Sequence, residues 1–468
     1  MITKPKGTND IYGKDAKIWK YIDEVVDSIM QKYNYSYIRT PIFESTELFH
    51  RGIGEVTDIV TKETYDFKDR GNRNITLRPE GTAGVVRSFI ENKMYGSPSL
   101  PAKLYYNGTM YRYERPQAGR DRELTQFGVE VLGTSDPLSD AEVISLAVNT
   151  YKLLGLEDVV VEINSLGDNE SRKNYKEKLT KYLEPHIDNL CDDCKARLQK
   201  NPLRILDCKI DSESDIIKNA PSILDHLNEE SKKRFDSVLE YLDIMEIKYK
   251  VNPNIVRGLD YYNHTVFEIK IDIPNIGKGQ TIGAGGRYNY LVKELGGPDT
   301  ECVGFASGIG RVVLALKEKE VKLPIKDEID VFIMYVNEEE KKYAAYLAQE
   351  LRMASYTTDT EYTSRSLKSQ FKQAERLNSK FVIILNSEEL NDGMVKIKNT
   401  KTKEEELISI EYLIYYLDEA LSDQSENDFD FSTFQKEIEL NHEECHCDHC
   451  SHEDCNCNEE LGEDYEEE

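Results

Sequence analysis

A short segment of the chain concentrates permanently charged side chains. Its eleven residues contain four arginines, Arg112, Arg115, Arg120 and Arg122. A guanidinium group stays charged at every physiological pH and can donate two hydrogen bonds at once, so fixed arginines suit a polyphosphate or a nucleic-acid backbone. Composition alone favours a simpler interpretation, in which solvated arginines form surface ion pairs. The residues opposite this segment distinguish a phosphate-binding site from a set of surface ion pairs.

The following segment offers side chains that could bind a cation. Apolar and polar residues alternate over 124–132, which places Gln126 and Glu130 on one face of a strand and Phe127 on the other. A carboxylate opposite the arginines would repel phosphate, so it better suits a cationic group or Mg²⁺. A pocket with both kinds of charge would therefore need two substrates, one anionic and one basic.

Two further segments repeat this mixture. The even-numbered residues of 76–82 share one face if the chain is extended there, and they are Thr76, Arg78, Glu80 and Thr82. Considered alone, Glu80 is better interpreted as a capping or turn residue. Arg257 precedes a tyrosine pair, Tyr261 and Tyr262, whose rings can stack and whose hydroxyls can donate hydrogen bonds. A tyrosine pair beside a strand belongs by default to the core.

The periodicity of the sequence predicts an α+β fold around these residues. Apolar residues recur every three to four positions over 19–33, which predicts a helix. Segments 104–114 and 124–132 alternate with a period of two, so we expect an antiparallel hairpin with a long basic loop. A charged helical stretch over 168–250 predicts an insertion, after which strand-like sequence returns at 265–271.

The chain is predicted to have three consecutive parts. Residues 1–322 form a large antiparallel-sheet domain that includes the insertion. Strand-like and helical segments alternate over 327–421, which predicts a small, mostly parallel α/β domain. Residues 422–468 are rich in Ser, Asn, Asp and Glu, and we expect this acidic tail to be disordered because it has too few apolar residues to bury.

The acidic composition comes mainly from the end of the chain. Of the net charge of −27, residues 418–468 contribute −19 and the rest only −8, so charge does not exclude a nucleic-acid partner. The longest apolar runs, such as 381–385, have about five residues, far from the roughly 20 that span a bilayer. Residues 1–7 carry no export signal, so we expect a cytoplasmic protein with reduced thiols.

Six motifs follow one another along the first 300 residues. They are Lys6-Gly7-Thr8-Asn9-Asp10, Thr76-Leu77-Arg78-Pro79-Glu80-Gly81-Thr82, Tyr111-Arg112-Tyr113-Glu114-Arg115-Pro116-Gln117, Gln126-Phe127-Gly128-Val129-Glu130-Val131, Arg257-Gly258-Leu259-Asp260-Tyr261-Tyr262 and Gly283-Ala284-Gly285-Gly286-Arg287-Tyr288. Together they closely resemble the motifs of histidyl-tRNA synthetases, which are class II aminoacyl-tRNA ligases. The resemblance extends over about residues 1–420. It implies a class II antiparallel sheet flanked by helices, a helical insertion and a C-terminal α/β anticodon-binding domain.

The resemblance also implies an activity and its residues. Such a homodimer would join L-histidine to ATP, bound with Mg²⁺, as an adenylate, release diphosphate, and pass the histidyl group to tRNA(His), releasing AMP. Arg112 would contact the α-phosphate, Arg120 and Arg311 would complete the ATP site, and Arg257 would stabilise charge on the α-phosphate during attack. The histidine contacts would be Glu80, Thr82, Gln126, Glu130, Tyr262 and Tyr288.

The same resemblance places Arg115 and Gln117 near the acceptor end of the tRNA. The sequence departs from the usual family pattern at Gly310, Thr125, Asp121 and Asn289-Tyr290. Gly310 directly precedes Arg311, and the family usually has an acidic residue at this position. The departure at Gly310 therefore concerns the orientation of Arg311. None of the departures removes a guanidinium or carboxylate group assigned above.

Cysteines lie in two groups that could bind metal. The tail carries four histidines and five cysteines, the latter being Cys445, Cys447, Cys450, Cys455 and Cys457. Thiolate and imidazole bind Zn²⁺ or Ni²⁺, but the spacing matches no standard finger, so we expect loose metal capture there. In the insertion, Cys191, Cys194 and Cys208 could form a zinc set with His186, although the irregular gaps favour ordinary packing.

Two alternatives to the ligase remain open. The first is a divergent paralogue that acts as a histidine-binding regulator; such proteins normally lack the C-terminal α/β domain and the arginine matching Arg257, and this chain has both. The second is a metal-responsive protein in which the tail carries the main role and the body is a scaffold. Histidine-dependent exchange of diphosphate into ATP separates the ligase from both.

Overall fold

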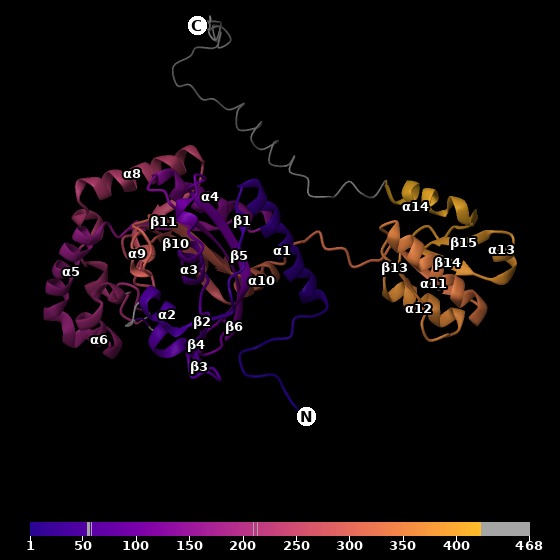
Figure 1. Ribbon diagram of the computed structural model, residues 1–468, viewed down its shortest axis with the longest axis horizontal. Coiled ribbons are helices and arrows are strands. Elements are labelled where there is room, and N and C mark those ends of the chain that lie inside the picture. The colour runs from indigo at the N-terminus through magenta and orange to yellow at the C-terminus, as the bar shows by residue number, and fades with distance from the viewer. Residues whose placement is uncertain (54–56, 58, 209, 213, 423–468) are drawn as a thin grey trace, which may run out of the picture. The chain divides into compact units, whose positions relative to one another are not determined.

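The computed structural model describes residues 1–53, 57, 59–208, 210–212 and 214–422. It divides into two compact units, Met1–Ile325 and Lys326–Glu468, which are described separately (Figure 1). All five tail cysteines and the predicted disorder after Ser422 lie outside the described residues. No helix in the described part of the chain combines the length and the apolar character needed to cross a membrane.

An eight-stranded sheet forms the centre of the first unit. In spatial order its strands are β1 (Ser36–Tyr37), β5 (Ala102–Tyr111), β6 (Glu123–Leu132), β11 (Cys302–Gly308), β10 (Gly277–Arg287), β9 (Asn263–Ile273), β7 (Val160–Ser165) and β8 (Tyr249–Val251). The pairs at the two edges are parallel and the other five are antiparallel. The predicted hairpin is confirmed, because β5 pairs antiparallel with β6.

Helices cover both faces of this sheet (Figure 1). One face packs against α1 (Lys14–Lys32), α4 (Pro137–Leu153), α8 (Glu229–Ile244) and α10 (Ile309–Glu318). Phe127 and Val129 of β6 point into this core, whereas Tyr106 of β5 joins the core on the opposite face. Because side chains alternate along a strand, Gln126 and Glu130 are placed on that second face. The predicted α+β class is confirmed.

A small antiparallel sheet lies beside the second face. Its strands are β2 (Phe43–Ser45), β4 (Asn74–Leu77) and β3 (Tyr65–Lys68). Helix α2 (Thr46–Ile53) packs against this sheet, and α3 (Thr82–Glu91) and α9 (Leu291–Glu294) pack against α2. Strand β4 ends at Leu77, so the residues that follow form a turn into α3. This sheet and its turn deliver Glu80 and Thr82 to the central sheet.

The insertion is helical, as its charged periodicity predicts. Its elements are α5 (Asn169–Leu183), η3 (Glu184–Asn189), α6 (Asp192–Lys200), η4 (Pro202–Ile205), α7 (Asp215–Lys218) and η5 (Ile223–His226), followed by α8. Side-chain caps begin the two longest helices: Asp168 accepts from the backbone of Ser171, and Asn228 from that of Ser231. Capping oxygens of this kind satisfy backbone donors that have no partner within the helix.

The second unit is an α/β domain with a mixed sheet. Its strand order is β13 (Thr358–Thr360), β12 (Val331–Tyr335), β14 (Phe381–Leu385), β15 (Met394–Asn399) and β16 (Glu405–Ser409). Helices α11 (Glu338–Met353), α12 (Leu367–Arg376), α13 (Ser387–Asn391) and α14 (Leu413–Ser422) complete it.

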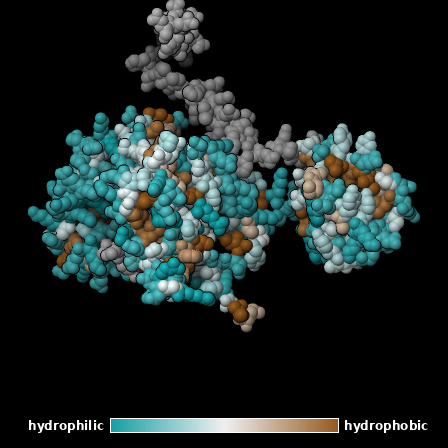
Figure 2. All heavy atoms as spheres, in the orientation of Figure 1, coloured by the Kyte–Doolittle hydropathy of each residue, from teal (hydrophilic) through white to brown (hydrophobic). Residues whose placement is uncertain are grey.

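The prediction of a mostly parallel sheet in this unit is wrong. Strands β13, β12 and β14 are parallel neighbours, but β15 and β16 pair antiparallel. The reason is the short connection after β14, which contains only the single-turn helix α13, whereas a parallel return requires a crossover of a dozen or more residues. Hydrophilic residues predominate on the visible face of both units (Figure 2).

Candidate active site

Four of the predicted arginines line one cleft in the first unit. The cleft has a volume of about 880 Å³, and its lining includes Arg112, Arg120, Arg257 and Arg311. They come from the β5–β6 hairpin, the loop before β9 and the start of α10, segments that lie up to 199 positions apart in the sequence. The structure therefore gathers guanidinium groups from distant segments around one hollow, as a polyphosphate site requires.

Arg311 and Arg120 leave positive charge uncompensated in this cleft. The Nη1 atom of Arg311 donates to the carbonyl of Thr281 at 2.6 Å, a neutral acceptor. Burial, and next the neighbouring charge of Arg120, lower the pKa of Arg311 to about 10. Arg120 lies 3.9 Å from a carboxylate oxygen of Glu114, at the outer limit of an ion pair. An anion bound between the two guanidinium groups would relieve this repulsion.

Arg257 is held over the cleft by an acid that the sequence analysis did not identify. Its Nη1 atom donates to Oε1 of Glu268 at 2.7 Å, and its guanidinium group lies 5.5 Å from the ring centre of Tyr262. Within the described residues its buried Nε has no partner. Glu268 occupies a polar position in the alternating pattern of β9, a signal that could have identified it.

Arg112 connects the hairpin to the turn before α3. Its Nε donates to the carbonyl of Pro79 at 2.8 Å, and its backbone N–H donates to the carbonyl of Arg122 at 2.8 Å. Arg112 is also one of the residues that line the cleft. The arginine thus brings the positively charged cleft next to the turn that carries Glu80.

Glu80 caps helix α3. Its two carboxylate oxygens accept from the backbone N–H groups of Thr82 and Ala83, each at 2.7 Å, and the residue is 5% exposed. The capping interpretation is confirmed. The expectation of one shared face over 76–82 is wrong because β4 ends before Glu80 and Arg78 turns inward, where it donates to the carbonyls of Thr40 and Thr109. Each Glu80 oxygen keeps a second lone pair for a ligand.

Glu130 forms a buried hydrogen-bonded group with two other predicted residues. The hydroxyl of Thr82 donates to its Oε1 at 2.6 Å, and the hydroxyl of Tyr288 donates to its Oε2. Burial raises the pKa of Glu130 to about 8, although both hydrogen bonds oppose this and nearby Glu80 reinforces it. A carboxyl group with this pKa can accept from or donate to an imidazole at neutral pH.

Aromatic residues enclose this acidic group. The ring of Tyr261 lies tilted against that of Tyr262 with 4.6 Å between ring centres, and it meets Tyr288 edge-on at 5.6 Å; all three residues are buried. Tyr106 was missed from the sequence, yet its hydroxyl is buried without a partner among the described residues. Its ring fits only because Gly81 and Gly128 flank it: an added Cβ would lie 2.3 Å and 2.5 Å from tyrosine atoms.

The remaining predicted residues are placed as follows. Gln126 lines the cleft, and its buried Oε1 lacks a partner within the described chain, so it is available to a ligand. Arg115 and Gln117 are exposed on the hairpin loop and do not line the cleft. The loop is nevertheless fixed, because Gln117 and Arg120 exchange two backbone hydrogen bonds and Gly119 packs against Arg311.

The departures from the family pattern have identifiable surroundings. A Cβ added at Gly310 would meet the carbonyl of Gly119 at 3.7 Å, which is an ordinary contact, so the position has room for the first atom of a side chain. Asn289 is buried, and its Oδ1 accepts from the backbone of Cys302 at 3.2 Å. Arg287, two positions earlier, is fully buried and ion-paired with Asp140. Both residues support the fold.

Comparisons with known proteins agree with this geometry. A family model described as Histidyl-tRNA synthetase matches residues 7–312, and an Anticodon binding domain model matches 330–420. "Histidine--tRNA ligase" of Staphylococcus haemolyticus is 50% identical over 420 residues, covering 90% of this chain and 99% of that protein. "Histidine--tRNA ligase 2" of Bacillus anthracis is 49% identical, covering 89% and 99%.

Solved structures give the same result. Apo histidyl-tRNA synthetase of S. aureus superposes with a TM-score of 0.77 at 45% identity and covers 89% of this chain and 100% of that one. The histidyl-tRNA synthetase of Nostoc shares the fold at 20% identity, with a TM-score of 0.64, covering 90% and 100%. The chain is a member of the histidyl-tRNA synthetase family.

Proposed function

We propose that this enzyme ligates L-histidine to tRNA(His) through a histidyl adenylate. One observation carries the proposal: an arginine-lined cleft adjoins a buried group of two glutamates, a threonine and tyrosines. The first part suits a nucleoside triphosphate, and the second suits an amino acid with a basic ring. This is the pair of substrates, one anionic and one basic, that the charge pattern requires.

The first step is attack of a histidine carboxylate oxygen on the α-phosphorus of ATP. An O–P bond forms, the bond to diphosphate breaks, and diphosphate leaves with the electron pair. Arg112 and Arg257 face the cleft and would stabilise the charge that develops on the α-phosphate. Arg120 and Arg311 would bind the outer phosphates, and Gln126 would hold the amino acid near the reacting atom.

Mg²⁺ would enter with ATP and neutralise its phosphates. Carboxylates of Glu114 and Glu268 line the cleft and are the oxygen ligands that Mg²⁺ prefers. In the second step a hydroxyl of the terminal tRNA ribose attacks the histidyl carbonyl, and AMP leaves. The exposed hairpin loop with Arg115 and Gln117 is the proposed contact for the acceptor end, and the second unit is the proposed contact for the anticodon.

Selectivity for histidine would come from the buried group. Glu130 can exchange a proton with an imidazole nitrogen, and Tyr262 and Tyr288 would enclose the ring. A ligand without ring nitrogens would leave these buried groups unpaired, which can reject it by a factor on the order of 10⁴–10⁵. We also propose that the enzyme works as a homodimer, as its family does.

Two assays test the proposal. Purified protein should exchange labelled diphosphate into ATP only when L-histidine is present, and it should charge tRNA(His) but not other tRNAs. Exchange without charging would instead support a paralogue that has lost tRNA function, and absence of both would reject the ligase. The regulator is not favoured, because the second unit and Arg257 are both present.

A further inference from the structure

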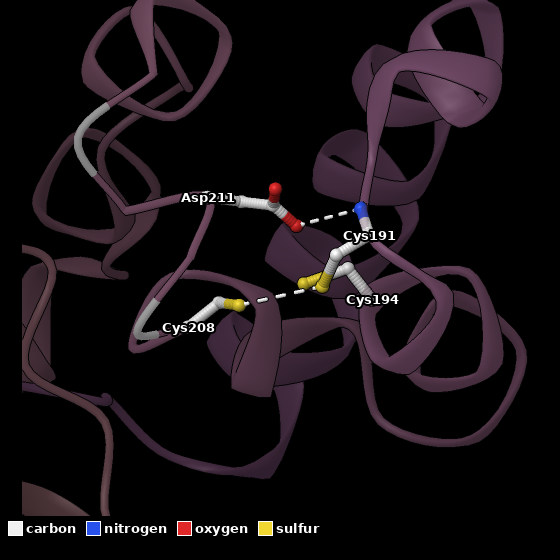
Figure 3. A group of neighbouring side chains, drawn as sticks. All are labelled: Cys191, Cys194, Cys208 and Asp211. Carbon is white, nitrogen blue, oxygen red and sulfur yellow. Dashed lines mark hydrogen bonds between the residues drawn. The ribbon is translucent and has the colours of Figure 1, made fainter.

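Four potential metal ligands converge in the insertion, away from the cleft described above. They are Cys191, Cys194, Cys208 and Asp211, hereafter the insertion cluster (Figure 3). Their ligand atoms all lie within 4.8 Å of one another. His186, which the sequence analysis considered as the fourth ligand, lies outside the cluster and packs against the ring of Tyr182. The fourth ligand is a carboxylate that the sequence analysis did not consider.

The separation of the Cys191 and Cys208 sulfurs matches that of two ligands around one ion. The Sγ atoms of Cys191 and Cys208 are 3.7 Å apart, far beyond the roughly 2.05 Å of a disulfide. Two thiolates bound tetrahedrally to Zn²⁺ at about 2.3 Å would be about 3.8 Å apart. The side chains point toward a common centre from two separate segments of the chain (Figure 3).

The backbone supports the same arrangement on both segments. Cys191 is the N-cap of α6 and Cys194 lies in its first turn, while Cys208 and Asp211 repeat the two-residue gap. The backbone N–H of Ile210 donates to Sγ of Cys208 at 3.4 Å, and that of Cys191 donates to Asp211 at 3.0 Å. Such N–H donors orient metal ligands and partly offset their negative charge.

Asp211 is a buried carboxylate that faces the cluster thiols. Asp211 is 7% exposed, and its carboxylate lies beside three thiols rather than beside a cation. Within the described residues no ion pair involves this carboxylate, which instead accepts from the backbone N–H of Cys191 and lies against the cluster thiols. A divalent cation among the four side chains would provide the missing positive charge.

We propose that the insertion cluster binds one Zn²⁺ per chain as a structural site. Three thiolates and one carboxylate complete a tetrahedron with no open position, which is the arrangement of structural rather than catalytic zinc. The ion would join the two ends of the segment that contains η4. From that segment Asn201 donates to Asp260 at 2.8 Å and Arg204 donates to the carbonyl of Gly258 at 3.2 Å, so the site supports the loop that carries Arg257.

The experiment must separate this site from the tail ligands. In a full-length background, the five tail cysteines are replaced by Ser and the four tail histidines by Asn. Cys194→Ser, Cys208→Ser and Asp211→Asn are then made in that background. Cys302→Ser is the matched control, because Cys302 is a buried free thiol outside the cluster. Metal content is measured by elemental analysis after purification under reducing conditions, and folding by circular dichroism.

The proposal predicts one zinc per chain in the background and in Cys302→Ser, and loss of most of it in both cluster cysteine variants. Asp211→Asn keeps three thiolates and should release zinc to a chelator at lower chelator concentration. X-ray absorption should give three sulfurs at about 2.3 Å and one lighter ligand. Three results would each overturn the zinc proposal. They are a background protein without metal, an unchanged zinc content in folded Cys194→Ser, and a Cys191–Cys208 disulfide in the native protein.

If a cysteine variant fails to fold, cobalt substitution of the background protein decides instead. Co²⁺ bound by three thiolates in a tetrahedral site gives intense visible absorption, and an octahedral oxygen site does not. Absence of that absorption at one equivalent of Co²⁺ would reject the site. None of these readings depends on aminoacylation, so failure of the zinc proposal and failure of the proposed function remain distinguishable.

Discussion

Arg257 is the residue at which a single substitution tests the proposed chemistry most directly. It is oriented by one acid, Glu268, and it lines the cleft. Arg257→Ala should lower histidine-dependent diphosphate exchange by on the order of 10²–10³, because a fixed donor to the transition state is lost. The KM for histidine should stay within a few-fold, since this side chain does not belong to the buried acidic group.

Steady-state exchange kinetics check this expectation. Arg73→Ala is the matched control, because Arg73 is an exposed arginine paired with Asp69 on the small sheet. The control should keep full activity. Unchanged turnover in Arg257→Ala would refute the catalytic role, and a large rise in KM at constant kcat would reassign the arginine to ground-state binding.

Glu130 makes the stability of the ligand-free protein depend on pH. The folded protein keeps this proton up to about pH 8, whereas an unfolded chain releases it near 4.5. The folded state therefore loses stability relative to the unfolded state as pH rises from about 5 to 8, by up to about 5 kcal/mol. Glu130→Gln removes this loss, so the melting temperature of the variant relative to wild type should increase across that interval.

Calorimetry without ligands at pH 5, 6, 7 and 8 measures the effect. Glu123→Gln provides the control, because Glu123 lies on the same strand but is exposed. Its melting temperature should follow that of wild type at every pH. A constant difference between Glu130→Gln and wild type over the whole range would contradict a raised pKa for Glu130.

At the scale of single residues, the sequence predicts which charged residues lie at the site better than it predicts the side chains that contact them. The type and spacing of Arg112 and Arg120 placed them beside Gln126 on one hairpin, and the structure has them at one cleft. The alternating pattern marks Glu268 as a polar position, but the roles of Glu268 and Tyr106 were not identified, because those roles depend on contacts between segments far apart in the chain. Such contacts follow from the register of the sheet, which local periodicity does not determine.

The insertion supports the Arg257 loop together with the central sheet, whose strand β9 carries Glu268. Asn201, at the start of η4, donates to Asp260 at 2.8 Å across the two segments. Asn201→Ala should lower the kcat of diphosphate exchange about fivefold, corresponding to the roughly 1 kcal/mol of one hydrogen bond, because the loop is less well positioned. The KM for histidine should change less than twofold.

Asn219→Ala controls for loss of an asparagine in the insertion. Among the described residues, the Asn219 side chain donates to the carbonyl of Asp215 at the start of α7 and makes no hydrogen bond to the Arg257 loop, so its removal should leave kcat unchanged. Equal kinetics for the two variants would show that the insertion does not position the loop. Thermal unfolding of both variants separates this effect from a general loss of stability.

Periodicity predicted the elements well and their pairing less well. The helix over 19–33 and the hairpin strands correspond to α1, β5 and β6, because each has one apolar face that its core must bury. The mixed sheet of the second unit was not predicted, because strand direction depends on the length of a connection and not on the pattern within a strand.

At the scale of the whole molecule, charge and metal affinity are distributed unevenly. Residues 422–468 carry 18 acids and one lysine, so the chain without them would have a net charge of −10 rather than −27. The residues that line the cleft and form the buried acidic group all lie before position 322. The tail contributes cysteines and histidines, while the insertion cluster holds a separate set of ligands.

Deletion of residues 422–468 should therefore preserve aminoacylation and reduce metal uptake. The kcat for charging should equal that of the full chain, and the KM for tRNA should be no higher, because removing acids weakens repulsion of a polyanion. Uptake of Zn²⁺ should fall to the single equivalent proposed for the insertion cluster, and uptake of Ni²⁺ should fall sharply. Charging assays at two salt concentrations and elemental analysis provide the measurements. Lost charging in the shortened protein would make the tail part of the catalytic apparatus, and unchanged metal uptake would show that the tail ligands bind none.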